Sequence, residues 1–287
     1  MEFKTGYLYV VDGARWVREA IYAATRLREL TKQPIAIIAS ESYETLIKFG
    51  ETTPNVQIKV VCELKGSNFA SKVIGMRNSP FENSLFMDTD TFVVYNIDAI
   101  FNLLNFFDVA MKQEPYFLTN IFPVNDDYKD ILAEYNTGVI LFKKSKMVMD
   151  LFQEWEDAII SKKFNDDYFD MPQLRNVLVN GHNKIKIYGL HENFNMQGLR
   201  SYKVIHGKVA IIHERFGSYW NSFSEYMWDN KKMNLVAKRI NSSSRKRIFI
   251  PYFNTVLSAN RLSIVYILKR FKIKLGFPEM DKKLAYK

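Results

Sequence analysis

The chain has 287 residues, 47% of them hydrophobic and 25% charged, which is typical of a globular protein and excludes a disordered one. Its net charge of +9 is unevenly placed, because residues 238–287 hold 13 Lys and Arg against two acids, a net of +11, and the remainder carries −2. The single cysteine, Cys62, excludes an internal disulfide and fits a reducing compartment.

The first half of the chain alternates predicted strands with predicted helices. Runs of β-branched and aromatic residues predict strands at 6–11, 34–40, 57–64 and 84–90. Segments with apolar residues at helical spacing predict helices between them, at 14–30, 41–50 and 68–79. This alternation indicates βαβ units, and therefore an α/β fold with a mostly parallel central sheet flanked by helices.

The second half continues with strand candidates, at 108–112, 138–143, 185–190 and 208–214. The polar stretch "NSSSRKR" begins at residue 241, so we predict a body at 1–240 and a basic C-terminal segment at 241–287. The N-terminus carries charges where a signal peptide has an apolar core, and no apolar run approaches the ~20 residues of a spanning helix. We therefore predict a cytoplasmic protein.

The stretch "LFMDTDTFVV" places Asp88 and Asp90 at the end of an apolar strand. Ionised carboxylates resist burial without a partner, and ligands of parallel sheets bind at the carboxyl ends of the strands. Two hard oxygen ligands there suit Mg²⁺ or Mn²⁺, which would also take oxygens from the diphosphate of a substrate. The alternative is a solvated turn after the strand.

Four motifs in order resemble one family. Residues 70–94, "ASKVIGMRNSPFENSLFMDTDTFVV", resemble the metal-binding region of GT-A nucleotide-sugar glycosyltransferases of the glycogenin and lipopolysaccharide galactosyltransferase type, glycosyltransferase family eight. The stretch "YNTGVILFKKS" (135–145) is similar to the Asn-Ser-Gly-Val strand of the family, and "DMPQL" (170–174) is similar to its Asp-Gln-Pro-x-Leu helix start. The stretch "VAIIHERFGSYW" (209–220) is similar to its late strand with a metal-binding His. The resemblance implies a Rossmann-like GT-A fold and a hexosyltransferase, of the retaining type.

The resemblance implies that Asp88, Asp90 and His213 hold Mn²⁺ or Mg²⁺ against the diphosphate of the donor. A lone His at a strand end is also a common polar terminus, so His213 keeps that alternative. The family often follows this His with Gly-x-x-Lys-Pro-Trp; here Gly217 and Trp220 are present and the Lys-Pro is missing, so Arg215 is a candidate for the phosphate contact.

Four further residues are implied in binding the nucleotide sugar. Lys72, on the helix before the metal strand, would reach the phosphate or sugar; its alternative is a solvated helix residue. Asp12 and Trp16 follow the first strand, where the family places the nucleobase, although Trp16 also fits the core face of its helix. Gly138 would permit close approach of the backbone to a ligand.

Two residues are implied in catalysis. Asn136, two residues before Gly138 in the chain, would contact the donor sugar or the acceptor. Asp170 would lie near the anomeric carbon, where a fixed carboxylate stabilises an oxocarbenium-like centre. Because Asp170 precedes Pro172 at a predicted helix start, a simple helix N-cap is the alternative.

The basic segment has a distinct composition. Residues 255–275, "TVLSANRLSIVYILKRFKIKL", combine an apolar series with five basic residues, which is typical of an amphipathic segment on an anionic membrane surface. A helix packed on the body with a solvated basic face is the alternative. The segment contains no nucleic-acid recognition motif, so we expect no nucleic-acid partner.

Two functions remain open from the sequence. The first is a metal-dependent glycosyltransferase that moves a sugar from a nucleotide-diphosphate sugar, with a UDP-sugar favoured, to a glycan or glycolipid acceptor. The second is a non-catalytic protein of the same fold that docks on anionic membranes through its tail. The first predicts metal-dependent hydrolysis or transfer of a nucleotide sugar, which the second would not show. The basic tail would place the protein peripherally at the cytoplasmic face of a membrane.

Overall fold

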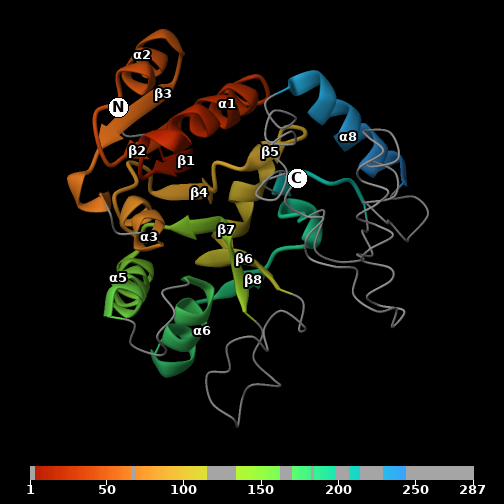
Figure 1. Cartoon of the computed structure of the whole chain (residues 1–287). Helices are drawn as coiled ribbons and strands as arrows, with labels where there is room; N and C mark the ends of the chain where they lie inside the picture. The colour runs from red at the N-terminus through yellow and green to blue at the C-terminus, as the bar shows by residue number, and fades with distance from the viewer. Residues whose placement is uncertain are drawn as a thin grey trace, which may run out of the picture.

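The centre of the molecule is a seven-stranded sheet with strand order β3-β2-β1-β4-β7-β6-β8 (Figure 1). The structure is a computed structural model that describes residues 4–65, 69–114, 134–161, 170–181, 184–197, 207–213 and 229–243. The strands are β1 (Thr5–Val11), β2 (Ile35–Ala39), β3 (Val56–Val60), β4 (Asn83–Met87), β6 (Val109–Gln113), β7 (Tyr135–Lys143) and β8 (Ile187–Gly189).

The sheet is mostly parallel, as predicted. The pairs β1–β2, β2–β3, β1–β4 and β6–β8 are parallel, whereas β7 runs antiparallel to both of its neighbours, β4 and β6. The carboxyl ends of β1, β4, β6 and β8 and the amino end of β7 therefore meet at one edge of the sheet. The residues that follow β4 and β6 and those that begin β7 are brought together at this edge.

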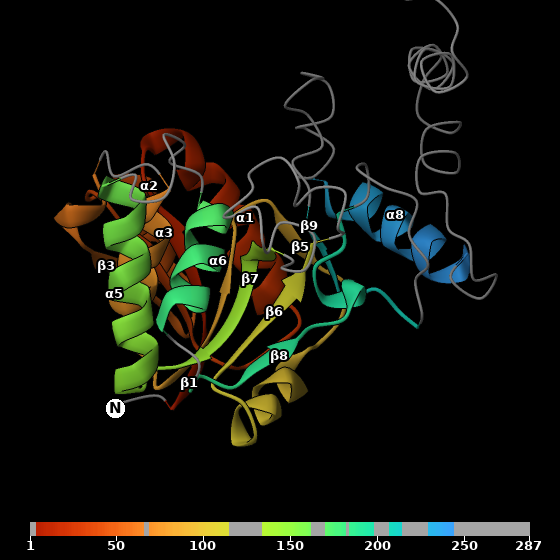
Figure 2. The ribbon, with the colours of Figure 1, turned by 90° about the horizontal axis from the view of Figure 1, so that it is seen from below.

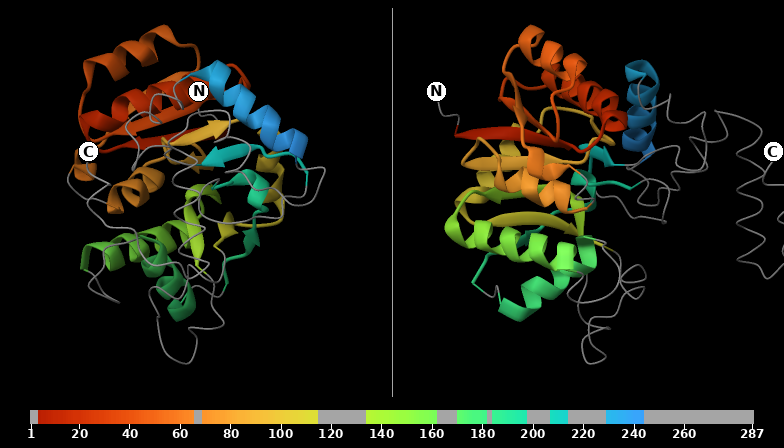
Figure 3. Two further views of the ribbon diagram at one scale, coloured as in Figure 1. Left: turned by 45° about the vertical axis from the view of Figure 1, so that its right-hand side comes forward. Right: turned by 60° about the vertical axis from the view of Figure 1, so that its left-hand side comes forward.

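Helices cover both faces of the sheet (Figure 3). One face packs against α1 (Val17–Arg28), α2 (Glu44–Thr52) and the 3-10 helix η3 (Asp98–Asn105). The other face packs against α3 (Ala70–Arg77), α5 (Lys146–Ser161) and α6 (Asp170–Gly181), of which α5 and α6 lie side by side (Figure 2). Because successive side chains of a strand point to opposite faces, Tyr7 and Tyr9 enter the first layer and Leu8 enters the second.

A small second sheet joins β5 (Thr91–Val93) to β9 (Ile211–His213) in antiparallel register. Its apolar side chains pack with those of α8 (Asn230–Ser243), the blue helix beside β5 in Figure 1. Hydrogen bonds tie α8 to α1, from the Tyr22 hydroxyl to Asn230 Oδ1 at 2.7 Å and from Arg26 Nη2 to Asn234 Oδ1 at 3.3 Å. This sheet continues the chain directly from β4, so it lies beside the same edge of the main sheet.

Several element boundaries differ from the sequence-based expectation. The predicted helix at 14–30 is split into a 3-10 turn, η1 (Ala14–Trp16), and α1. The predicted strand at 57–64 ends at Val60 and is followed by the 3-10 turn η2 (Cys62–Leu64). Helix α5 was not predicted, although its buried residues repeat at helical spacing.

The end of α8 differs from the boundary that we predicted between the body and the basic C-terminal segment. Helix α8 extends to Ser243, and its Asn241 Oδ1 accepts a hydrogen bond from the Val209 N–H at 2.7 Å. The proposed division at 240/241 therefore falls inside α8. The amphipathic segment 255–275 lies outside the described residues. Within the described ranges, no helix combines the length and apolar character that a transmembrane span requires.

Candidate metal centre

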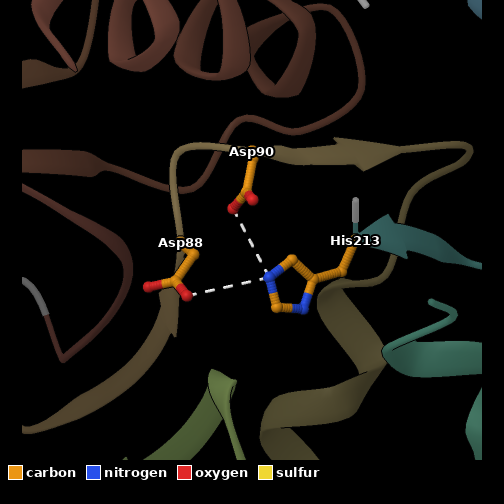
Figure 4. A group of neighbouring side chains, drawn as sticks. All are labelled: Asp88, Asp90 and His213. Carbon is orange, nitrogen blue, oxygen red and sulfur yellow. Dashed lines mark ion pairs between the residues drawn. The ribbon is translucent and has the colours of Figure 1, made fainter. Parts of the chain in front are cut away.

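Asp88, Asp90 and His213 form a cluster at the carboxyl end of β4. Asp88 follows the last residue of β4, and a tight turn carries the chain through Asp90 into β5. Strand β9 pairs with β5 so that His213 lies opposite Thr91. The His213 Nε2 atom is 3.4 Å from Asp90 Oδ1 and 3.7 Å from Asp88 Oδ2, and all three side chains point toward one another (Figure 4).

The turn that carries the two carboxylates is held on both sides. The Thr91 N–H and hydroxyl both donate to the Asp88 carbonyl, at 3.2 and 2.8 Å, and the Asp88 N–H donates to the Gly138 carbonyl at 2.8 Å. The hydroxyl of Thr89, between the two aspartates, donates to Glu19 Oε2 of α1 at 2.9 Å. The carboxylates are therefore positioned by the backbone of β7 and by a helix from the start of the chain.

Gly138 makes room for the imidazole ring. A Cβ atom added at Gly138 would lie 2.0 Å from Cε1 of His213, far inside van der Waals contact. The close approach that we expected at this glycine is therefore made by the His213 ring. Contact of Gly138 with a nucleotide sugar remains a prediction.

Lys72 joins Asp170 to the cluster. Its Nζ atom lies 2.7 Å from Asp170 Oδ2, 3.6 Å from Asp88 Oδ2 and 3.4 Å from the Thr137 hydroxyl oxygen. The side chains of Lys72 and Asp170 are 15% and 6% exposed, so the alternative of a solvated Lys72 is wrong. The Thr137 hydroxyl donates to Asp170 Oδ2 at 2.5 Å, so the carboxylate is held by two side chains beyond any role as a helix cap.

The electrostatics of the cluster favour an added cation. Burial raises the pKa of Asp88, and the Lys72 charge offsets this only in part. Burial alone would lower the pKa of Lys72, but the Asp170 and Asp88 carboxylates outweigh it, and the pKa is raised. Burial likewise disfavours the charged imidazolium of His213, whereas Asp90 and Asp88 more than compensate and raise its pKa. Carboxylates thus outnumber permanent positive charges here.

The donor atoms fit a divalent metal ion. One ligand atom from each of Asp88, Asp90 and His213 can be chosen so that all lie within 4.8 Å of one another. Two carboxylate oxygens and one imidazole nitrogen are ligands that Mn²⁺ accepts, and Mg²⁺ shares the preference for the oxygens. The three residues predicted as metal ligands are therefore brought together, and the structure suits a divalent cation without selecting between these two.

Asn136 is buried beside this cluster and makes three hydrogen bonds to described residues. Its Oδ1 atom accepts from the Gly138 N–H at 3.0 Å and from Asn195 Nδ2 at 2.7 Å, and its Nδ2 group donates to Glu114. An Asn side chain can make four hydrogen bonds. These three partners therefore leave one N–H of the Asn136 amide for a ligand. Its predicted contact with a sugar remains a prediction.

Asp12 and Trp16 lie at the carboxyl end of β1, which pairs with β4. Trp16 is half-buried, packs against the core under α1, and carries the Arg15 guanidinium 4.1 Å from the centre of its ring. The expected core contact of Trp16 is thus present, and contact of Asp12 and Trp16 with a nucleobase remains a prediction. Arg215 and the residues around it lie outside the described residues.

Sequence reasoning missed four side chains that support the site: Glu19, Glu114, Thr137 and Asn195. Thr137 stands between Asn136 and Gly138, inside a motif already singled out, so its position was a usable signal. The other three carry no local pattern. Glu19 reaches a residue 70 positions away and Asn195 reaches one 59 positions away, so their roles follow from the fold.

The sequence matches no protein-family model, and no curated protein is significantly similar to it. Solved structures are similar in fold. An active-site mutant of LgtC has 14% identity and a TM-score of 0.57, covering 85% of this chain and 96% of its own. The galactosyltransferase LgtC in complex with donor and acceptor sugar analogues has 14% identity and a TM-score of 0.53, covering 84% and 96%. Mouse xyloside xylosyltransferase 1 has 14% identity and a TM-score of 0.53, covering 75% and 98%.

Two longer glycosyltransferases match over part of their length. The chain spans 40% of the bifunctional WbbM and 47% of GlyE from Streptococcus pneumoniae TIGR4. At these identities the comparisons establish the fold. The chain has the GT-A fold of LgtC and of mouse xyloside xylosyltransferase 1, which confirms the fold that the sequence resemblance implied.

The contact between Gly138 and His213 generates a direct test. Gly138→Ala places a methyl group where the imidazole lies, so the ring must move away from the two carboxylates. We expect Mn²⁺ affinity, measured by isothermal titration calorimetry, to fall about 10-fold or more. The control is Gly189→Ala at the end of β8, where no atom lies within 4 Å of the added Cβ. Equal Mn²⁺ affinity of the two variants would contradict this account of the site.

Proposed function

We propose that the protein is a metal-dependent glycosyltransferase that transfers a sugar from a nucleotide-diphosphate sugar to a glycan or glycolipid acceptor. The observation that carries the proposal is the position of Asp88, Asp90 and His213, which form a divalent-metal ligand set at the carboxyl end of a strand in a GT-A fold. One similar structure, that of LgtC, contains donor and acceptor sugar analogues, and this supports a sugar donor and a sugar acceptor as the substrates. A UDP-sugar donor, a hexose and retention of configuration are favoured by the family resemblance of the motifs.

The metal site would act on the donor diphosphate. A bound divalent ion supplies positive charge that stabilises the departing diphosphate. Asp88 and Asp90 provide the anionic ligands, and His213 provides a neutral nitrogen ligand from β9. Lys72 adds a buried ammonium within 3.6 Å of Asp88, which places a hydrogen-bond donor next to the metal ligands for a phosphate or sugar oxygen.

Asp170 would act on the sugar. Among the described residues, Lys72 is the one ion-pair partner of the Asp170 carboxylate. The Thr137 hydroxyl donates a hydrogen bond to the same Asp170 oxygen, Oδ2. A carboxylate held in this way is preorganised, and preorganised charge stabilises the positive charge that develops at an anomeric carbon. Trp155 Nε1 donates to the Asp170 carbonyl at 2.8 Å, which anchors the start of α6 as well.

We also propose that the basic segment brings the enzyme to an anionic membrane surface on the cytoplasmic side. The support is the charge distribution, with +11 in residues 238–287 and −2 in the rest of the chain. Each basic residue near such a surface contributes ~1 kcal/mol. A glycolipid acceptor would then be met at the membrane. The same distribution supports the alternative of a non-catalytic membrane-docking protein, which predicts membrane binding without turnover.

The first prediction separates the enzyme from the docking protein. Asp90→Ala removes a metal ligand, so Mn²⁺-dependent hydrolysis or transfer of a UDP-sugar should fall to background while circular dichroism shows an unchanged fold. The matched control is Asp150→Ala, which removes an exposed carboxylate on α5. Full Mn²⁺-dependent turnover by the Asp90 variant would refute the metal site, and the absence of turnover in the unaltered protein across a panel of nucleotide sugars would favour the docking protein.

The second prediction separates Asp170 from the metal ligands. Asp170→Asn keeps the size of the side chain and removes the charge that we place next to the reacting sugar. Turnover should fall by at least about 100-fold, whereas UDP and Mn²⁺ affinities, measured by calorimetry, should change only a few-fold. A parallel loss of UDP affinity and turnover would instead place Asp170 in the donor-binding surface.

The third prediction concerns the tail and uses the observed end of α8. A chain that ends at Ser243 keeps the contact of Asn241 with Val209 and removes residues 244–287. It should lose co-sedimentation with phosphatidylserine vesicles and keep transfer to a small soluble acceptor. Binding of the full chain should weaken with salt, because surface charges are screened over ~10 Å at 0.1 M. Equal vesicle binding by the two chains would show that the tail is not the membrane anchor.

A further inference from the structure

The proton position on the His213 ring decides whether this residue can bind a metal. A neutral imidazole carries one N–H and one lone pair, and only the nitrogen with the lone pair is a ligand. The ring directs Nε2 toward Asp88 and Asp90 (Figure 4), and its Nδ1 atom lies 2.8 Å from Asn195 Oδ1. The group that faces Nδ1 therefore selects the tautomer.

The orientation of the Asn136 amide is determined at both ends. The Gly138 N–H is a backbone group that can only donate, and it lies 3.0 Å from Asn136 Oδ1. On the other side, Asn136 Nδ2 donates to the Glu114 carboxylate, which is itself 3.6 Å from the Lys112 ammonium. An exchanged amide would set two donors together at Gly138 and two acceptors together at Glu114, so the oxygen must face Gly138.

The orientation of Asn195 follows from that of Asn136. Asn195 Nδ2 donates to Asn136 Oδ1 at 2.7 Å, and the exchanged amide would bring two oxygens to that distance. Asn195 is fully buried, so water does not satisfy a misplaced group. Its Oδ1 atom must therefore face His213 Nδ1, and an amide oxygen can only accept, so Nδ1 carries the proton.

The backbone keeps Asn195 beside the ring. The next residue, Met196, donates its N–H to the Ile211 carbonyl at 3.0 Å, and its carbonyl accepts from the His213 N–H at 2.9 Å. Asn195 thus lies alongside β9 at the level of His213. Its side chain reaches across to Asn136 on β7 and connects the two sheets at the metal centre.

We propose that Asn195 is a positioning residue that, held by Asn136, keeps His213 protonated at Nδ1 so that the Nε2 lone pair faces the metal site. The selection is needed because the neighbouring carboxylates favour the opposite tautomer. With no metal bound, an Nε2–H group would donate to Asp90, whereas an Nε2 lone pair faces two anions. Asn195 opposes this preference and keeps the ring ready for a cation. The inference rests on the proposed metal site, and it assigns to Asn195 a role in ligand geometry rather than in the fold.

Two variants separate positioning from a structural role. Asn195→Leu removes both the acceptor for His213 and the donor to Asn136. Asn195→Asp also removes the donor and sets a carboxylate oxygen against Asn136 Oδ1, yet it retains an acceptor for the Nδ1 proton. A purely structural role would make the aspartate variant at least as harmful as the leucine variant, because both lose the hydrogen bond to Asn136 and the aspartate adds a buried charge. A positioning role predicts that the aspartate variant retains the tautomer and the leucine variant loses it.

The tautomer is read directly from the ring nitrogens by ¹H–¹⁵N NMR of the metal-free full-length protein at alkaline pH. His213→Gln identifies the signals of this residue among the four histidines. We expect Nδ1–H in the unaltered protein and in Asn195→Asp, and a shift to Nε2–H in Asn195→Leu. An Nε2–H ring in the unaltered protein, or an unchanged Nδ1–H ring in the leucine variant, would overturn the inference.

Mn²⁺ affinity supplies the second measurement. Loss of a residue that orients a metal-binding His costs about 10- to 100-fold in affinity, so Asn195→Leu should bind Mn²⁺ that much more weakly and Asn195→Asp should stay near the unaltered protein. Equal losses in both variants would overturn the positioning role. If the unaltered protein bound no Mn²⁺, the proposed function would fail, and the NMR measurement would still decide the tautomer independently.

Discussion

The carboxylates of Asp88, Asp90 and Asp170 lie close together at one edge of the sheet and repel one another, and the arrangement of the site depends on how this repulsion is offset. Two like charges about 4 Å apart in a partly buried setting repel by about 4 kcal/mol, and burial adds its own penalty. Lys72 reduces the repulsion by lying between Asp88 and Asp170, and His213 contributes positive charge when protonated. A divalent cation would complete the compensation, and the elements around the site hold the negative charge in place.

The positioning of the ligands is distributed over distant parts of the chain. Glu19 on α1 holds the turn between the aspartates, β7 supplies the Gly138 backbone on which His213 lies, and Asn195 holds the other nitrogen of its ring. Such a buried polar network is favourable only if its members are satisfied, because an unpaired buried polar group is costly. Hydrogen bonds link Glu114 through the two asparagines to His213, whereas Glu114 Oε2 has no hydrogen-bond partner among the described residues.

The fold supports a conclusion about how the chain is arranged, and the site supports a conclusion about its chemistry. A GT-A fold describes how the chain is arranged, and one fold hosts many functions. In the proposed function, the ligand set would act on the charge of the leaving group, and Asp170 would act on the anomeric centre. The absence of a Lys-Pro after His213 sets this chain apart from the usual motif, and it leaves Lys72 as the basic side chain observed next to the metal ligands among the described residues.

The sequence by itself determined the features that depend on local patterns. Alternating apolar runs predicted β1, β2, β4 and the helices between them, and the position of Asp88 after such a run predicted ligands at a strand end. The concentration of charge in the last 50 residues is also visible without a structure. The predictions of strands and helices succeed because strand and helix periodicity act over a few residues.

Only the tertiary structure decided which distant groups meet. His213 is 125 positions from Asp88, and the pairing of β5 with β9 brings them within 3.7 Å. The pairing of Lys72 with Asp170, the space that Gly138 leaves for the imidazole, and the amide orientations of Asn136 and Asn195 likewise have no local signature. The physical reason is that strand register and side-chain packing across layers set these contacts, and both depend on the whole chain being folded.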